Sequence, residues 1–551
     1  MASTGANFDE SSHILKPKPS SNGGNSGGQA AATTTTTNTT TNVSMISGTP
    51  RSAQSIDQNS SHPSSGRNSL ANPTDVSSLV EAESRRRSGS SVTVASDGGI
   101  FSEGSGHAGL SGTASLNHIG LNYINSILGS GIVGIPYALH KAGFGFGLFL
   151  LISLAIVTDY SLSLLVKSAN LAGVTSYQDL VHVAFGRPGF YLLTLLQFIY
   201  PFIAMISYNV IIGDTVTKVF KRLFALSHSN ILANRNSIVF ISTVFVTLPL
   251  SLQKDIAKMS RVSMLSLLLI IYITLFVIMS FGRMSDLVGT NDDSFTFIGG
   301  DITQSIGVIV FAYMCHHSSF LLYGSLENPT QVRWEKVTHA SVGISCLIVI
   351  VFGTAGYATF KSFSQGDLFE NYCLSDDGAN TARLLFTITI MLTYPIECFV
   401  VREVLENVFW PYKELLTKRH HLLLTLAIVS VTFIMSTFTD CLGIVLELNG
   451  VATALPLAFI LPSLCYMKLE TGKVTSKKKI YALLLAIFGT SVTIIGTMKV
   501  FANLFFGHTS SNCSHGHELD YCLSNKTITP ALNSTIANIH PFANVTPTTI
   551  T

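Results

Sequence analysis

Glycine and proline interrupt the first apolar segment of this chain, which is long enough to cross a lipid bilayer. Between Gly129 and Pro136 lie three glycines, one serine and one proline. Relative to alanine, glycine and proline in a helix interior cost about 1 and about 3 kcal/mol, respectively. In hydrocarbon, a broken backbone is tolerated only where protein buries it or where it lines a wet cavity. The segment therefore predicts a spanning helix with a break at a functional position.

Two interpretations of this break are open. Glycines can simply let helices pack closely, as small residues spaced four apart do in membranes. Secondary transporters instead use broken helices to expose backbone groups to a substrate near the middle of the bilayer. Pro136 and the flanking Asn122 and Asn125 go beyond what close packing needs. They favour the second interpretation.

The composition of the chain is that of a membrane protein. Of its 551 residues, 47% are hydrophobic and 12% are charged, whereas soluble domains carry about 25% charged residues. The formal net charge is +2, and no basic patch with interleaved aromatic residues is present, so we expect no nucleic acid partner. The eight cysteines form no CxxC pair and no Cys/His ligand spacing, which argues against a structural zinc site.

Residues 1–115 differ from the rest and predict a disordered, cytosolic N-terminal tail. They are rich in Ser, Thr, Gly and Asn, so they cannot bury enough apolar surface to offset the entropy of ordering. They also lack the basic start and apolar core of a signal peptide. Within this tail, the basic triplet 85–87 followed by Ser88 resembles a site for a kinase that prefers basic sequences. A chance match or an affinity for anionic lipid explains the triplet equally well.

Apolar windows of about 20 residues, the length that crosses a bilayer, predict eleven spans within residues 116–505. The fold class is therefore an all-α polytopic membrane protein. Spans one to five and six to ten form two sets of five, and the odd number inverts the second set, as in many transporters. The polar middle of span six, Phe311–Phe320, is the expected second break. The spans lie near 119–140, 143–166, 190–217, 237–252, 262–282, 303–323, 339–360, 383–402, 422–439, 442–466 and 480–503.

An odd number of spans places the two termini on opposite sides of the membrane. Loops on the side of the N-terminus carry more Lys and Arg residues than the other loops, which favours a cytosolic N-terminus. Residues 506–551 are then an extracellular or lumenal tail, in which Cys513 and Cys522 are candidates for a disulfide. The glycosylation acceptors expected in this tail are Asn512, Asn525, Asn533 and Asn544. Sequons that chance can explain also occur in the N-terminal tail, at Asn38, Asn42 and Asn59.

Five strings in the membrane domain carry a specific resemblance. Taken in order across about 119–467, they resemble the sodium-coupled neutral amino acid transporters, within the amino acid/auxin permease group. The resemblance implies a five-plus-five inverted-repeat fold with broken helices one and six, plus an eleventh helix, that works by alternating access. The strings are NSILGSGIVGIPYAL at 125–139, FAYMCHHSSFLLYGSLENPT at 311–330, GDLFENYC at 366–373, LTYPIECFVVREV at 392–404 and DCLGIVLELNG at 440–450.

A zwitterionic amino acid presents a carboxylate and an ammonium group, and the two breaks offer partners for both. Backbone N–H groups freed in the first break, with the positive end of the half-helix that follows, favour the carboxylate. Backbone carbonyls freed in the sixth span can accept from the ammonium. The expected substrate-binding residues are Gly129, Ser130, Gly131, Ile132, Phe311, Ala312 and His316.

The coupling ion expected from the resemblance is sodium, a hard cation that prefers oxygen ligands. The resemblance implies that Asn125 and Thr393 belong to a sodium site. Thr393 is followed here by Tyr394 and Pro395, where family members more often have Val-Pro, so the register of this ligand stays open. The structural alternative is a threonine hydroxyl that bonds back to its own helix. No other cofactor is expected.

Ionisable residues inside the spans are candidates for function. His316 matches the histidine of the family's Cys-His motif, and His317 stands where family members often have proline. We expect one histidine to be packed and hydrogen-bonded and the other to face the cavity. Asp159, Glu397 and Glu447 also lie inside spans, but they are assigned no role, because partners at helix ends explain them equally well.

These features together predict secondary active transport of neutral L-amino acids coupled to sodium. A proton-coupled carrier of a vesicular or lysosomal membrane is one alternative, and an amino acid sensor with little transport is another. The plasma membrane is the favoured location, with an endolysosomal membrane as the alternative. An enzyme is not expected, because neither histidine has an accompanying nucleophile or metal cluster.

Overall fold

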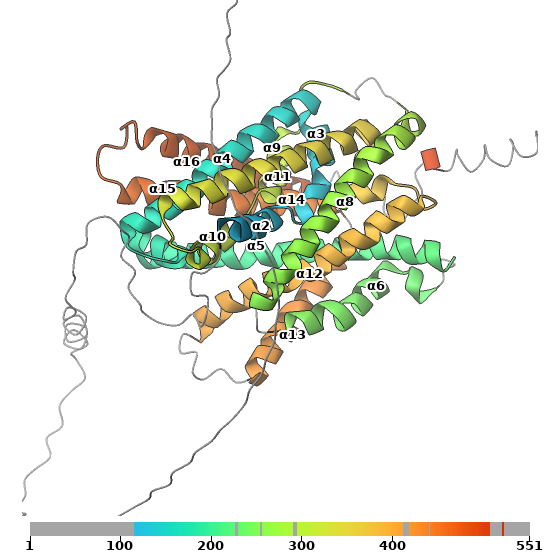
Figure 1. The fold of residues 1–551 in the computed structure, drawn as a ribbon, viewed down its shortest axis with the longest axis horizontal. Helices are drawn as coiled ribbons and strands as arrows, with labels where there is room; N and C mark the ends of the chain where they lie inside the picture. The colour runs from blue at the N-terminus through green and yellow to red at the C-terminus, as the bar shows by residue number, and fades with distance from the viewer. Residues whose placement is uncertain are drawn as a thin grey trace, which may run out of the picture. The chain divides into compact units, whose positions relative to one another are not determined.

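The computed structural model describes residues 115–225, 230–253, 256–289, 295–410, 418–439, 441–506 and 521–522. Within these ranges every regular element is helical (Figure 1). Nine helical segments of this described part are long and apolar enough to cross a membrane. The N-terminal tail up to residue 114, with Ser88, and the four C-terminal glycosylation acceptors lie outside the described residues.

The all-α membrane architecture expected from the sequence is confirmed. The expected fourth span is shorter than the others and consists of α6 (Arg235–Ser242) and α7 (Leu248–Ser251), joined by a π-helical turn. The expected tenth span runs from α14 (Leu442–Asn449) through two π-helical turns into α15 (Leu461–Leu469). α5 (Tyr177–Leu223) is kinked at Gly186, whose φ of 67° is not helical. The other long helices are α4 (Phe144–Ala172), α8 (Ile256–Val288), α11 (Gln331–Phe360), α12 (Asp377–Phe409), α13 (Lys418–Ser436) and α16 (Ile480–Phe506).

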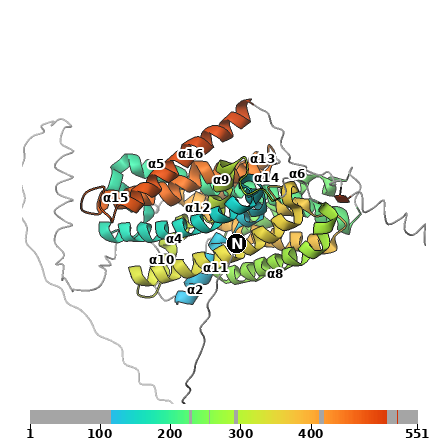
Figure 2. The ribbon, with the colours of Figure 1, turned by 90° about the horizontal axis from the view of Figure 1, so that it is seen from above.

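Large apolar side chains cover the outer faces of the helix bundle. Phe149 and Ile156 on α4 are 59% and 66% exposed, and Met498 on α16 is 68% exposed. Figure 2 shows α16 and α8 on opposite sides of the bundle. Such side chains would be unfavourable in water over so large an area, whereas a bilayer accepts them. The outer faces of these helices are therefore the surface that lipid covers.

Two membrane segments are broken near their middle, as the sequence predicts. The first consists of α2 (Leu116–Ile127), a 3-10 turn over Ser130–Gly134, and α3 (Ile135–Ala142). Pro136 lies in the first turn of α3, where its missing N–H costs no helical hydrogen bond. The sixth segment consists of α9 (Ile302–Ala312) and α10 (His316–Ser325). The inverted relation between the two sets of five spans stays a prediction.

The connection between α11 and α12 is buried, although loops usually run over the surface. Leu368–Asn371 form a 3-10 turn whose four residues are all buried. The backbone of Gly366 approaches α14 so closely that a Cβ on Gly366 would lie 2.4 Å from the nitrogen of Gly443. The Gly366 carbonyl oxygen also lies 3.6 Å from where a Cβ on Gly134 would be. This connection therefore packs directly against the end of the first break.

A disulfide joins this buried connection to a residue beyond α16. Cys373 and Cys522 are bonded, with their Cα atoms 5.6 Å apart. The expected pairing of Cys522 with Cys513 is wrong, because that pairing rested on nearness in sequence alone. The contacts of Tyr521 explain the observed pairing. Its hydroxyl donates to the carbonyl oxygen of Asn371 at 2.6 Å, which brings the next residue, Cys522, beside Cys373.

Candidate functional site

The two helix breaks touch each other. A Cβ added to Gly131 would lie 2.5 Å from the Cα of Ala312 and 2.8 Å from its Cβ. Real Cβ atoms do not approach other atoms this closely, so only glycine fits at position 131 without movement of the sixth segment. The structure thus brings together two residues, 181 positions apart, that the sequence placed in one substrate site.

The backbone of the first break offers hydrogen-bond donors. Ser130 and Gly131 open a 3-10 turn, and the first N–H groups of a helical turn have no partner within it. Gly129 differs from the expectation, because its N–H donates to the Ile127 carbonyl at 2.9 Å. Ile132 is buried at 3% exposure and contributes to the wall of the break. Ser130 and Gly131 are therefore the available donors here.

The break in the sixth segment offers acceptors. The carbonyl oxygen of Phe311 accepts from the N–H of Met314 at 3.2 Å and also from the N–H of Tyr313, so a ligand would share this oxygen with the backbone. Cys315 begins α10 as its N-cap without a side-chain capping bond. His316 is fully buried, and neither of its ring nitrogens has a hydrogen-bond partner among the described residues. The expectation of one hydrogen-bonded histidine is therefore wrong for His316.

Aromatic and ionisable side chains surround the breaks. The Tyr200 ring lies 5.9 Å from the Phe311 ring and 5.3 Å from the His317 ring, measured between centroids. His317 Nε2 lies 3.9 Å from Glu397 Oε1. Tyr208, also on α5, is the side chain nearest to a Cβ on Gly129, at 3.9 Å from its hydroxyl oxygen. Side chains of α5, α10 and α12 therefore converge where the two breaks meet.

Hydroxyl pairs tie the half-helices α2 and α10 together on one side of the breaks. The Tyr123 hydroxyl lies 2.8 Å from Ser319 Oγ, and Ser126 Oγ lies 3.1 Å from Ser318 Oγ. Either hydroxyl of each pair can donate to the other. These contacts hold the N-terminal half of the first segment against the C-terminal half of the sixth.

The two expected sodium ligands come from α2 and α12. Asn125 is 8% exposed and lies one turn before the break. Thr393 is half-buried, and its hydroxyl donates to the Thr389 carbonyl at 2.9 Å. A hydroxyl that bonds back to its own helix is the alternative role given to Thr393 in the sequence analysis. The hydroxyl oxygen of Thr393 still has lone pairs that a cation can use. A sodium site at these residues stays a prediction.

Of the three intramembrane carboxylates that the sequence analysis singled out, two have clear structural partners. Asp159 Oδ2 lies 2.5 Å from Nδ1 of His339, and Glu447 Oε2 accepts from the Gln304 amide at 2.6 Å. Among the described residues, the closest polar contact of Glu397 is the loose one with His317. The sequence analysis missed Tyr200 and Tyr208, although a signal was present: Gln197, Tyr200, Tyr208 and Asn209 place polar groups along one span.

Charged side chains hold the buried α11–α12 connection in place. Lys218 of α5 pairs with Glu370 at 2.9 Å. Arg383 of α12 is fully buried and donates to the carbonyl oxygens of Phe369, at 2.7 Å, and Tyr372, at 2.6 Å. Burial and the neighbouring Glu370 raise the pKa of Asp367, which lies outside the membrane spans, to about 7. These contacts fix the connection that packs against the end of the first break.

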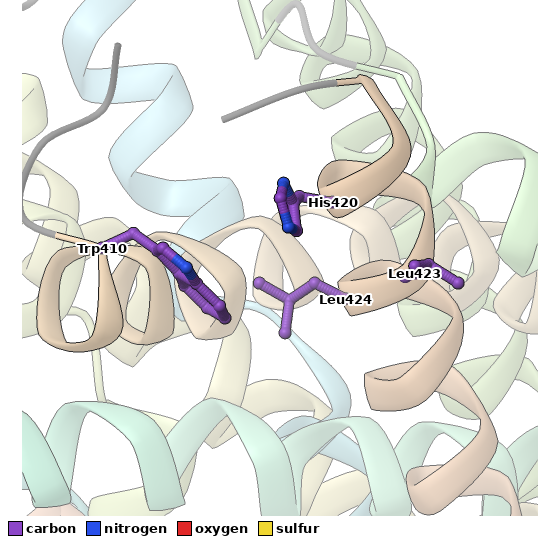
Figure 3. Close-up of a pocket in the computed structure, with 4 residues that line it drawn as sticks. All are labelled: Trp410, His420, Leu423 and Leu424. Atoms are coloured by element: carbon purple, nitrogen blue, oxygen red, sulfur yellow. The ribbon is translucent and has the colours of Figure 1, made fainter. Parts of the chain in front are cut away.

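An apolar cavity of about 230 Å³ lies away from the breaks, at the end of α12 and the start of α13 (Figure 3). It is lined by Trp410, His420, Leu423 and Leu424. The rings of Trp410 and His420 lie 5.9 Å apart. None of the expected substrate or sodium residues lines it. The cavity therefore adds nothing to the site between the breaks.

The model of the family described as transmembrane amino acid transporter protein matches residues 112–502. A Danio rerio protein named "Putative sodium-coupled neutral amino acid transporter 11" is 46% identical over 442 residues, which cover 80% of this chain and 96% of that protein. Vacuolar amino acid transporter 2 of Saccharomyces cerevisiae is 31% identical over 405 residues, covering 71% of this chain and 84% of that protein.

A solved structure of a manganese transporter from Eremococcus coleocola is also similar. It has 12% sequence identity and a TM-score of 0.48, and the match covers 78% of this chain and 97% of that one. The family match spans both helix breaks and the buried connection between α11 and α12. This chain is an integral membrane protein that belongs to the transmembrane amino acid transporter family.

Proposed function

We propose that this chain carries neutral L-amino acids across a membrane by alternating access, with sodium as the coupling ion. The observation that carries the proposal is the contact between Gly131 and Ala312, which joins the two breaks. The free N–H groups of Ser130 and Gly131, at the start of a helical turn, suit a carboxylate. The carbonyl oxygens of Phe311 and Ala312 suit an ammonium group. A zwitterion fits between groups of these two kinds.

The same groups, together with the relatives, support the proposal of a neutral cargo and of sodium coupling. The backbone groups at the breaks compensate both charges of the zwitterion. Asn125 and Thr393 add side-chain oxygens on α2 and α12, and oxygen is the ligand that sodium prefers. The name of the Danio rerio relative includes both sodium coupling and neutral amino acids.

The test is uptake of labelled neutral amino acids by the purified full chain in vesicles, with sodium or with choline outside. We expect uptake to require sodium. Asn125→Ala and Thr393→Ala should each raise the sodium concentration for half-maximal uptake, by about tenfold for a lost ligand worth about 1.4 kcal/mol. Thr389→Ala is the matched control, because its backbone carbonyl, which Thr393 uses, remains. Uptake that is unchanged in choline would reject sodium coupling.

A proton-coupled carrier in an intracellular membrane is the second candidate. The yeast relative is named as a vacuolar transporter, and that observation favours it. Uptake that persists in choline and depends on a pH gradient would support this candidate over the first. Uptake in neither condition, by folded protein, would favour a sensor.

Sidedness is a further prediction, because the direction of transport depends on it. We expect the C-terminal tail to be extracellular or lumenal, and the bond between Cys373 and Cys522 supports an oxidising compartment on that side. Endoglycosidase should increase the gel mobility of the protein. The change should vanish when all four C-terminal acceptors are replaced with Gln. A change in mobility that vanishes only on replacing Asn38, Asn42 and Asn59 would show that the protein has the opposite orientation in the membrane.

A further inference from the structure

Glu397 and His317 form a buried, incompletely bonded pair beside the helix breaks. Their side chains are 8% and 5% exposed, and the closest nitrogen and oxygen are 3.9 Å apart. That separation is longer than a hydrogen bond. Glu397 Oε2 and His317 Nδ1 have no hydrogen-bond partner among the described residues. The pair can therefore bind a proton, and it lacks the hydrogen bonds that are typical of a purely structural contact.

Among the described residues, no cationic side chain lies close enough to compensate a charge on the pair. From α5, the hydroxyl groups of Tyr200 and Tyr208 lie within electrostatic reach of Glu397. From the start of α10, His316 adjoins His317, and Cys315 lies near Tyr200.

On α12 itself, the nearest cationic side chain is Arg402. It donates to the carbonyl oxygen of Ser251 on α7 and to the hydroxyl of Thr425 on α13. No ionisable group of α7, α8 or α13 reaches the pair among the described residues. An unprotonated Glu397 beside a neutral His317 is therefore an uncompensated negative charge.

The cost of that charge depends on whether the site is open. Water solvates a carboxylate in an open cavity, whereas closure removes the water, and burying an unpaired charge costs several kcal/mol. One proton on the pair makes it neutral overall, as a carboxylic acid on Glu397 beside a neutral imidazole, because burying two separate charges is costly. An imidazole nitrogen facing a carboxylate can share a proton, whereas sodium prefers ligands that are all oxygen.

We propose that the His317–Glu397 pair must hold one proton for the transport site to close around its cargo. The proton enters from water while the site is open, binds between Glu397 Oε1 and His317 Nε2, and leaves when the site opens again. The proposal rests on the proposed amino acid transport, and it adds a proton to the loaded carrier whether or not sodium is carried as well. It makes the closing step depend on pH even when no pH gradient exists.

Exchange of an amino acid for itself isolates this step, because only the loaded carrier crosses. The full chain is reconstituted in vesicles with equal pH and equal unlabelled alanine on both sides, and the entry of labelled alanine is followed between about pH 6 and about pH 8. We expect wild-type exchange to rise as the pH falls, by at most about tenfold per pH unit, the limit for one proton. Glu397→Gln mimics the protonated form and should exchange at a rate independent of pH.

Glu447→Gln is the matched control. Glu447 is also a buried intramembrane carboxylate, but it is bonded to Gln304, so the variant should keep the wild-type pH dependence. Wild-type exchange that does not vary with pH would overturn the proposal, as would a pH dependence that Glu397→Gln retains. Loss of exchange in Glu397→Gln with recovery in Glu397→Asp would also overturn it, because the negative charge itself would then be required.

Infrared spectroscopy gives a second readout that does not need transport. The carbonyl stretch of a protonated carboxylic acid should appear in the wild type as the pH falls over the same range. This band should lose intensity in Glu397→Gln. In Glu447→Gln, the part of the band that belongs to Glu397 should remain. A wild-type spectrum in which Glu397→Gln removes no such band contradicts the proposal even if the chain proves not to transport alanine. If the band is present but no exchange of alanine is observed, the proposed transport is rejected, whereas proton binding by the pair is not.

Discussion

Replacing Gly131 with valine is expected to abolish amino acid uptake while the protein still reaches the membrane. A Cβ at this position would lie 2.5 Å from the Cα of Ala312, so the two breaks would be pushed apart. The backbone donors of the first break would then no longer face the carbonyl oxygens of the sixth segment. Misplacement of binding groups by about 1 Å can cost about a hundredfold in rate. Labelled uptake and the amount of protein in the membrane are the measurements.

Gly343→Val is the matched control for this variant. Gly343 lies within α11, and a Cβ there meets nothing within 4 Å, so uptake should stay close to that of the wild type. The melting temperature of each purified variant separates a damaged site from a damaged fold. Normal uptake kinetics in Gly131→Val would show that the amino acid binds somewhere other than between the breaks.

The helix breaks could be predicted because their cause is local. Glycine and proline within Gly129–Pro136 weaken a helix wherever it lies, and the polar stretch in the sixth span is visible in the same way. The contact between Gly131 and Ala312 followed from placing both breaks in one site. By contrast, the N–H of Gly129 could not be assigned, because its bond to Ile127 depends on local backbone angles that the sequence does not specify.

Long-range pairings were beyond the sequence. Cys522 bonds with Cys373, 149 residues away, and nothing in the spacing of the cysteines distinguishes that partner from Cys513. Glu397 illustrates the same limit. Its position in a span marked it as ionisable and buried, but the facing residue, His317, comes from another helix. Only the packing of α10 against α5 and α12 brings the two side chains together.

Replacing Arg383 with methionine is expected to cause the largest loss of stability among the variants considered. The guanidinium is fully buried and bonds with three acceptors, the carbonyl oxygens of Phe369 and Tyr372 and the Asn380 side chain. Methionine preserves much of the volume but leaves these buried acceptors without a donor. Removing one partner from a buried charged network costs about 3–5 kcal/mol. Thermal unfolding of the purified full chain measures the loss.

Arg222→Met tests whether burial is the cause. Arg222 also donates two hydrogen bonds, to the Asp377 carboxylate at 2.8 and 3.3 Å, but both side chains are exposed. Exposed ion pairs contribute about 0–1 kcal/mol, so this variant should melt close to the wild type. Because Arg383 holds the connection that packs on the first break, its variant should also lose uptake below its melting temperature. Equal melting temperatures for the two variants would show that the connection is held by its apolar contacts and the Cys373–Cys522 bond rather than by Arg383.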